Sequence, residues 1–554
     1  MNKAFKRLEL LDSIFLLILV FVSALPWVGE LGFYSDDWSY LAALRESAPA
    51  GLSAMFRSLV HTDSGLLVRP VQLACLVLEF KAFGLHPLPY HLLIAALLGA
   101  TVVLLYVVLR ASSIARCYSV AMAIIFAFLP QYSTDRFWLS SQQTLLCMLF
   151  ALAGIAAMLR YASPSGSRKA PWLAAASTCF VASILSYEVA LGIIVASIVV
   201  VAWRTFRRSS GEHRALSILP PLGVALPIVL FGLLKILFQH RYVLHHRIPL
   251  FWLRGEIWKL AAFHAFQFNL GNYVFRLPSV LASLYRQSAI TAGSAAAAAA
   301  VTILLTLYFW RFQDESQVLT RLAGFKAIAF GLVLFGLGYA LFSPVPGTAF
   351  ESAGLNNRIT IASALGASCV IVGLITLVCM VAQSFFRLRM FAVLVALTCA
   401  SYSIVCNGIS FFWIDAASKQ AAVLRNIRTN VTAPPQQSTF LLDGFCQYSG
   451  PAVVFDTDWD TTGALRILFS DPTLTADVVS KDMQLNRDAV DTFIGGDLEG
   501  HYLYGERLFV YNTRAKILSQ LSSQEAAEAY LHRFNQTNGN GCPPAQAEDG
   551  VSIF

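Results

Sequence analysis

Two adjacent carboxylates, Asp36 and Asp37, lie in the segment Gly32-Phe-Tyr-Ser-Asp-Asp-Trp-Ser-Tyr-Leu41, directly after the first long apolar stretch. Removing neighbouring acids from bulk water is costly, so acids at such a boundary are usually retained for function. One acid of a close pair can have a raised pKa and act as a general base, while the other binds a cation or orients a substrate. The simpler alternative is a solvated loop in which Asp36 caps a short helix.

A second group of candidate residues is basic and lies between residues 239 and 268. Arginine binds phosphate oxygens bidentately, so these cations could hold a lipid phosphate or pyrophosphate. Interleaved Trp and Phe side chains suit a helix that is partly embedded in a membrane surface. The alternative is an amphipathic helix whose cations only touch lipid headgroups. The basic members are His240, Arg241, His245, His246, Arg247, Arg254, Lys259 and His264.

The elements that must position these residues are membrane helices. Of 554 residues, 57% are hydrophobic and 13% are charged, whereas a soluble globular chain is about a quarter charged. The mean hydropathy is +0.62. Apolar runs of roughly 17–25 residues can cross about 30 Å of hydrocarbon as helices. We expect about eleven spans, at residues 11–28, 90–109, 118–131, 141–159, 171–186, 188–203, 216–238, 289–310, 324–342, 359–384 and 390–412.

The distribution of Lys and Arg predicts the orientation. With a cytoplasmic N-terminus, the cation-rich connections near residues 110–116, 160–169, 204–214, 311–326 and 387–389 all fall inside, as the positive-inside rule requires. The expected location is the inner cell membrane. The net charge of +8 is explained by topology and anionic lipid, so no nucleic-acid partner is expected. Val22-Ser23-Ala24 resembles a signal-peptidase site, but the length of the segment favours an uncleaved first span.

The chain divides into a membrane part, residues 1–412, and a polar tail, residues 413–554. With this orientation the tail is extracytoplasmic, and its pattern predicts a small α/β domain with strands at 438–442, 452–455 and 507–511 and a helix at 523–534. Only Cys446 and Cys542 of the ten cysteines lie in the tail. In an oxidising compartment we expect them to form a disulfide; the alternative is two free thiols.

The order of several short motifs resembles the GT-C glycosyltransferase superfamily, especially the protein O-mannosyltransferase and aminoarabinose transferase branches. The resemblance covers roughly residues 1–410. It consists of the acidic pair Asp36-Asp37, the dipeptide Arg69-Pro70, the segment Gly84-Leu-His-Pro-Leu-Pro-Tyr-His91, the short loop with Asp135, the turn Ser186-Tyr-Glu188 and the span entry Asn356-Asn-Arg358. Tyr187 stands where this superfamily commonly has Lys, which puts a phosphate role for that turn in doubt.

This resemblance implies inverting transfer of a sugar from a polyprenyl-phosphate donor to a hydroxyl of a glycan, glycolipid or protein acceptor, on the outer face of the membrane. Asp36 or Asp37 would be the general base. A divalent cation, Mg or Mn, could bridge Asp36, Asp37 and Asp135. The alternatives are a transporter or flippase for a lipid-linked saccharide, and a non-catalytic scaffold for polysaccharide assembly. The donor phosphate would be bound by Arg358, Arg241, His245, His246 and Arg69, with Asp135, Glu188 and His91 in acceptor-binding or supporting positions.

Overall fold

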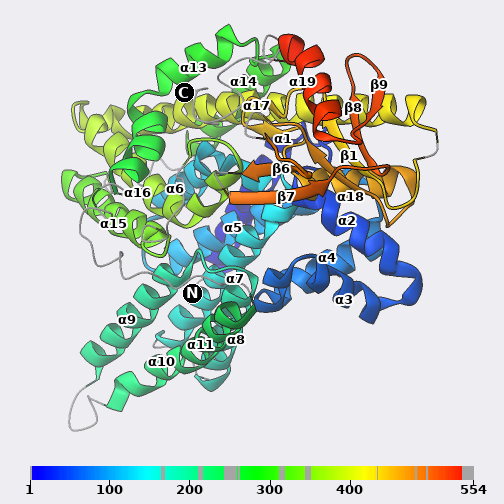
Figure 1. The fold of residues 1–554 in the computed structure, drawn as a ribbon. Coiled ribbons are helices and arrows are strands. Elements are labelled where there is room, and N and C mark those ends of the chain that lie inside the picture. The colour runs from blue at the N-terminus through cyan, green and yellow to red at the C-terminus, as the bar shows by residue number, and fades with distance from the viewer. Residues whose placement is uncertain are drawn as a thin grey trace.

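The computed structural model describes residues 3–163, 169–209, 216–242, 259, 262–310, 319–342, 351–432, 434–480, 483–494 and 497–538. Long helices dominate the chain up to Asn430, and a smaller strand-containing region follows (Figure 1). Helix α1 (Lys3–Ala24) leads into a layer of short helices, α2 (Asp36–Ser47), α3 (Leu52–Thr62), η2 (Ser64–Val68) and α4 (Pro70–Phe83). This short-helix layer lies beside the strand-containing region in Figure 1.

The rest of the bundle follows in the order of the chain. Its N-terminal half contains α5 (Pro87–Ala111), α6 (Arg116–Phe128), η3 (Pro130–Arg136), η4 (Leu139–Ser141), α7 (Gln142–Tyr161), α8 (Ala170–Ser186), α9 (Leu191–Arg208), α10 (Leu219–Gly223) and α11 (Ala225–Tyr242). Its C-terminal half contains η8 (Phe266–Phe275), α13 (Leu277–Arg286), α14 (Ala292–Phe309), α15 (Arg321–Tyr339), η10 (Leu355–Thr360), α16 (Ile361–Cys379) and α17 (Ser384–Asn430).

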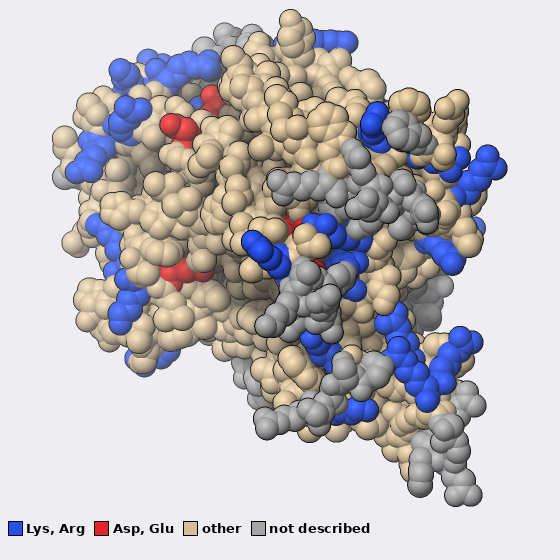
Figure 2. Space-filling view, turned by 180° about the vertical axis from the view of Figure 1, so that it is seen from behind, with Lys and Arg blue, Asp and Glu red and all other residues tan. Residues whose placement is uncertain are grey.

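The helices confirm a polytopic α-helical membrane architecture but not the number of spans. Each of the eleven predicted spans coincides with helical structure. Within the described ranges, seven helices are long and apolar enough to cross a membrane, or eight if α6 and η3, bent by 61°, form one broken span. Helix α8, for example, has only 17 residues. Figure 2 shows broad areas without charged side chains, as expected of a surface that faces lipid, while Lys and Arg lie along parts of the edge, near the centre and at the lower right of the view.

Helices α15 and α16 pack through glycines at backbone contact. Cβ atoms at Gly338 and Gly366 would collide with the backbones of Ser363 and Phe335 respectively, and one at Gly331 would lie 2.7 Å from the carbonyl oxygen of Gly366. Small residues allow membrane helices to approach this closely, which compensates for the weak hydrophobic drive between helices in lipid. The contact fixes α16 and therefore also η10, the short segment that precedes it.

The C-terminal region is α/β, as predicted. Its main sheet has the order β4-β1-β8-β9, in which β1 pairs in parallel with β4 and β8, and β8 pairs antiparallel with β9. The β2-β3 pair and the β5-β6-β7 sheet are both antiparallel. The strands are β1 (Thr439–Asp443), β2 (Tyr448–Ser449), β3 (Ala452–Val453), β4 (Thr475–Val478), β5 (Gln484–Leu485), β6 (Ala489–Ile494), β7 (Asp497–Leu503), β8 (Leu508–Asn512) and β9 (Ile517–Gln520); the helices are α18 (Asp458–Phe469) and α19 (Gln524–Asn538).

Helix α18 joins this region to the short-helix layer. Thr457 and Asp460 form a capping box at its start, which satisfies backbone N–H groups that a helix leaves unpaired. A Cβ atom at Gly463 would collide with the backbone of Trp38, so α18 and α2 touch directly. Arg45 of α2 donates to the carbonyl oxygen of Ile467 at 2.6 Å. The strand-containing region and the segment with the acidic pair therefore lie on the same side of the bundle (Figure 1).

The structure bears on two further predictions, the domain boundary and the disulfide. The predicted boundary between residues 412 and 413 lies inside α17, which continues without a break to Asn430. Cys446 is disulfide-bonded, but its predicted partner Cys542 lies outside the described residues, so the pairing itself stays a prediction. The eight cysteines of the membrane part are free thiols.

Candidate active site

The segment between α1 and α2 is held by buried hydrogen bonds. His91, at the start of α5, places its Nε2 2.9 Å from the carbonyl oxygen of Gly32. The indole of Trp138 donates to the carbonyl oxygen of Tyr34 at 2.9 Å, and the Tyr34 hydroxyl donates to that of Trp413 at 2.8 Å. Helices α5 and α17 and the connection between η3 and η4 thus fix one short stretch of backbone. The geometry gives His91 a supporting position beneath the acidic pair.

Asp37 is buried, and both of its carboxylate oxygens accept hydrogen bonds. Its Oδ1 accepts hydrogen bonds from the backbone N–H and the hydroxyl of Ser140, at 2.9 and 2.6 Å, and its Oδ2 accepts from the backbone N–H of Tyr34 at 3.0 Å. Burial raises the pKa of Asp37 to about 7, against the effect of the Ser140 and Tyr34 donors. Because its oxygens are occupied by the protein itself, Asp37 ties the start of α2 to η4 and offers little to a ligand.

Asp36 is half-buried and is the acid that can meet a substrate. It is the first residue of α2, after Ser35, whose positive φ of 46° turns the chain. Burial raises the pKa of Asp36, while the Arg358 and Arg69 guanidinium groups lower it and the Asp63 carboxylate raises it. Two stretches of the chain, residues 63–69 and the segment with Arg358, therefore converge on one carboxylate. Ser35, and not Asp36, occupies the N-cap position, so helix capping does not account for this acid.

Arg358 approaches Asp36 from η10, which is bound to η3. The Asn357 side chain donates to the Ser133 hydroxyl at 2.9 Å and accepts from the backbone N–H of Thr134 at 3.1 Å. The Arg358 guanidinium lies 4.6 Å from the centre of the Trp138 ring, a cation–π contact. Its buried Nε has no hydrogen-bond partner among the described residues. Asp135 is fully buried on the same stretch of η3 and interacts electrostatically with Arg358.

Arg69 is the first of three charged side chains, Arg69, Glu188 and Lys235, that contact one another in turn. We call these three residues the charged chain. Arg69 precedes Pro70, which starts α4. Its guanidinium lies 4.5 Å from the centre of the Tyr187 ring and 3.8 Å from the Glu188 carboxylate. Glu188 in turn pairs with Lys235 of α11, whose ammonium also donates to the carbonyl oxygen of Ile184 at 3.0 Å. Like that of Arg358, the Arg69 Nε is buried without a hydrogen-bond partner in the described part of the chain.

Lys235 is a residue that the sequence analysis missed. It lies inside a predicted span, and its side chain is 6% exposed. A lone ammonium in an apolar span is costly unless it is paired, so its presence was itself a signal of function. Of the predicted basic residues nearby, Arg241 lies in the last turn of α11, but its side chain is outside the described part. His245 and His246 are outside the described residues altogether.

The C-terminal region contributes a further acid, Asp456. Asp36 and Asp456 lie close enough for each charge to affect the other. The Tyr448 hydroxyl donates to Asp456 Oδ2 at 2.7 Å, while Oδ1 is buried without a hydrogen-bond partner among the described residues. Burial raises the pKa of Asp456 to about 6. The next residues, Thr457 and Asp460, cap α18, but nothing in the local sequence pattern places Asp456 beside Asp36.

The three acids proposed to share a cation have other partners in this structure. Both carboxylate oxygens of Asp37 accept hydrogen bonds from the protein. Across the described ranges there is no group of three or more His, Cys, Asp or Glu side chains that could hold one ion. Asp36 and Asp135 instead share a guanidinium neighbour, Arg358. A dependence on Mg or Mn stays a prediction, and no step below is assigned to a metal.

Comparison with known proteins returns structural likeness only. No protein-family model and no curated protein sequence matches the chain. Among solved structures, it is similar to ArnT from Cupriavidus metallidurans bound to undecaprenyl phosphate, with 12% identity, 87% coverage of each chain and a TM-score of 0.32. The apo form of the same ArnT matches with 14% identity, 86% coverage of this chain, 87% of that one and a TM-score of 0.34. At these TM-scores the likeness carries no functional argument, and the case for function stands on the geometry of the site.

Proposed function

We propose that this chain is a membrane glycosyltransferase of the GT-C type that uses a polyprenyl-phosphate sugar as its donor. One observation carries the proposal. Two guanidinium groups, Arg358 and Arg69, act on the half-buried Asp36, and each has a buried Nε without a partner in the described structure. Buried donors are rarely left unpaired without a ligand or water to meet them. Guanidinium groups pair well with phosphate oxygens, so the unfilled positions suit a phosphate beside a carboxylate.

The reaction follows from charge placement. Asp36 takes the proton of the acceptor hydroxyl as the acceptor oxygen forms a bond to the anomeric carbon. The bond from that carbon to the phosphate oxygen breaks, and the electron pair leaves with the polyprenyl phosphate. Attack opposite the leaving group inverts the anomeric centre. Arg358 and Arg69 stabilise the negative charge that develops on the phosphate, and such preorganised stabilisation is usually the largest contribution to catalysis.

The surrounding residues have supporting parts in this proposal. Asp37 and His91 hold the backbone around Asp36, as their hydrogen bonds support. Glu188 and Lys235 orient Arg69 through the charged chain. Asp135, beside Arg358, holds that guanidinium near the donor phosphate. Arg241, His245 and His246 remain proposed donor-binding residues on the basis of the sequence.

Topology is part of the same proposal. We propose that the N-terminus lies in the cytoplasm and that Asp36 lies at the outer face of the inner membrane. Because α18 packs directly on α2, the C-terminal region lies on the side of Asp36 and is therefore periplasmic. The cation-rich ends of α5, α7 and α9 lie at the opposite ends of those helices from His91, Ser140 and Glu188.

The test compares two adjacent acids. Asp36→Asn should lower the release of polyprenyl phosphate from a polyprenyl-phosphate sugar, in membranes that contain acceptor, by about 10²- to 10⁴-fold, the usual contribution of a general base. Donor binding and melting temperature should change little. Asp37→Asn should instead lower the melting temperature, because three donors lose a charged acceptor, with activity reduced in proportion to the folded protein. Full activity of folded Asp36→Asn would overturn the assignment.

A further inference from the structure

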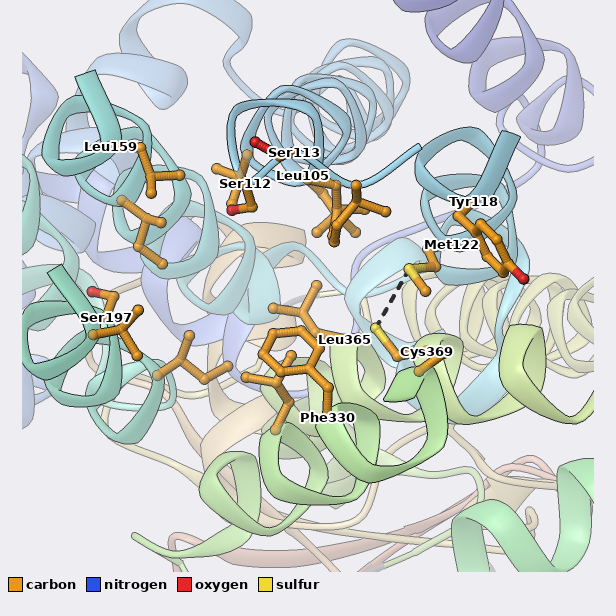
Figure 3. A pocket seen from close by; sticks show the side chains of 18 of the residues that line it. Leu105, Ser112, Ser113, Tyr118, Met122, Leu159, Ser197, Phe330, Leu365 and Cys369 are labelled. Carbon is orange, nitrogen blue, oxygen red and sulfur yellow. Dashed lines mark hydrogen bonds between the residues drawn. The ribbon is translucent and has the colours of Figure 1, made fainter. Parts of the chain in front are cut away.

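A cavity lies within the membrane part, and neither Asp36 nor Arg358 lines it. It has a volume of about 560 Å³ and is formed by α5, α6, α7, α9, α15 and α16. Figure 3 shows its wall, with Leu105, Leu159, Phe330 and Leu365 directed toward the interior and Ser112 and Ser113 at the turn that ends α5. The wall is mostly aliphatic, so the cavity suits a hydrocarbon chain better than a polar molecule.

The cavity lies toward the cation-rich end of the bundle. Helix α9 begins at Leu191, three residues after Glu188 of the site, and lines the cavity from Ile193 to Arg204. At a rise of 1.5 Å per residue, Arg204 lies about 20 Å along the axis from the start of α9. Lys326, near the start of α15, lines the same cavity. A phosphate held by Arg358 and Arg69 is therefore at the other end of the helix.

The two cations of this cavity lack acidic partners in the described structure. No Asp or Glu lines the cavity, and neither Arg204 nor Lys326 has an ion pair among the described residues. Other cations at this end do have partners: Arg110 lies 3.5 Å from Glu9, and Arg116 donates to Asp12 at 2.6 Å. Protein carboxylates thus neutralise some cations of this membrane face, but not the two beside the apolar cavity.

We propose that this cavity binds one anionic phospholipid of the cytoplasmic leaflet, with an acyl chain between the helices and the phosphate at Arg204 and Lys326. Membrane-facing cations gain about 1 kcal/mol each from an anionic lipid surface. The apolar wall accounts for the chain, and the two cations account for the anionic headgroup. The headgroup position is separate from the proposed reaction, because Arg204 lies near the far end of α9 and neither Asp36 nor Arg358 lines the cavity.

Native mass spectrometry of the purified full-length protein tests this. The delipidated protein is titrated with dioleoyl-phosphatidylglycerol, with dioleoyl-phosphatidylcholine and with undecaprenyl phosphate in parallel. We expect one tightly retained phosphatidylglycerol, and roughly 10- to 30-fold weaker retention in Arg204→Gln/Lys326→Gln, from the loss of two charges. Arg207→Gln is the matched control, because Arg207 lies on the same helix but stacks on Trp203 at 5.1 Å and does not line the cavity.

A second variant tests the acyl-chain half of the proposal. Ala196 lines the cavity from α9, so Ala196→Trp should fill part of it and lower phosphatidylglycerol retention while both cations remain. Equal retention of phosphatidylcholine, or unchanged retention in the double variant, would overturn the proposal. Stronger binding of undecaprenyl phosphate than of phosphatidylglycerol at this site would overturn it too, since the cavity would then belong to the donor. None of these measurements depends on transferase activity.

Discussion

Charged side chains near the two ends of α9 differ in whether they have partners of opposite charge. At the Asp36 end, acids and bases from distant segments meet: Arg69 with Glu188, Glu188 with Lys235, and Arg358 with Asp36 and Asp135. At the other end, Arg204 and Lys326 border an apolar cavity without a carboxylate in its lining. The first arrangement fixes side chains before any ligand arrives. The second leaves two charges for a ligand to neutralise.

The backbone shows the same difference. Around Asp36, buried hydrogen bonds from Trp138, His91 and Asn357 join segments that are more than fifty residues apart. A catalytic site benefits from such rigidity, because preorganised groups need no rearrangement in the transition state. Around the cavity, the wall is built from aliphatic side chains of six helices, which can adapt to a chain of variable shape. The comparison predicts that single substitutions cause large losses of activity at the first end and small ones at the second.

After Asp36→Asn, the largest effect is expected from Arg358→Gln. Removing a preorganised charge from a developing anion typically lowers kcat by about 10²- to 10³-fold. The loss should appear mainly in kcat, measured as polyprenyl phosphate released per folded enzyme. Arg57→Gln is a suitable control, because Arg57 is an exposed arginine of the short-helix layer whose side chain, among the described residues, bonds only to Ser53. Equal losses in the two variants would mean that Arg358 contributes only general surface charge.

Next comes the glycine contact that positions η10 and hence Arg358. Gly338→Leu places a side chain where α15 meets the backbone of α16 at Ser363, and overpacking of this kind costs about 1–3 kcal/mol. We expect a lower melting temperature together with reduced activity. Gly336→Leu, on the same helix, has no atom within 4 Å of the new Cβ and should behave as wild type. If both variants melt alike, the close helix contact does not stabilise the fold.

How far the sequence predicts this architecture depends on the range over which each signal acts. Local patterns identified the helices and part of the tail: the predicted strand at 438–442 is β1, that at 507–511 is β8, and the helix at 523–534 is α19. The predicted strand at 452–455 is only the two-residue β3, and β4, β6, β7 and β9 were not predicted. Positive-inside asymmetry and motif order were sufficient to nominate Asp36, Arg69 and Arg358, which the fold does bring together.

Contacts between segments that are distant in the sequence could not be predicted from these local patterns. Asp36 and Asp37 are neighbours with the same chemistry, and only the position of Ser140, about a hundred residues later, makes one structural and leaves the other available. Lys235 was hidden in an apolar span, and Asp456 lies in a region that reads locally as a helix cap. The predicted count of eleven spans was not confirmed because hydropathy alone does not separate full spans from shorter buried helices such as α8.

The dependence of activity on pH gives a third, moderate effect. A general base must be deprotonated, so activity should fall as pH falls through the pKa of Asp36, which burial raises above its usual range. The nearby Arg358 guanidinium lowers that pKa, so Arg358→Gln should move the acid limb of the kcat/KM profile to higher pH. Arg57→Gln should leave the limb in place. A shift to lower pH in Arg358→Gln would contradict the proximity of the two groups.

The smallest effect is expected at Asp456, where the C-terminal region meets the site. Its Oδ2 accepts from Tyr448, whereas its buried Oδ1 has no partner in the described structure and lies within electrostatic reach of Asp36. A carboxylate oxygen placed in this way is suited to accept a hydrogen bond from the acceptor. Asp456→Asn should therefore raise the acceptor KM by roughly tenfold, the value of one hydrogen bond to a charged group, with kcat and donor KM nearly unchanged.

Asp471→Asn, on the exposed turn after α18, should change neither constant. A fall in kcat without a change in acceptor KM would move Asp456 from acceptor recognition to the support of Asp36, and would show that the strand-containing region completes the rigid end of the molecule and does not receive the acceptor.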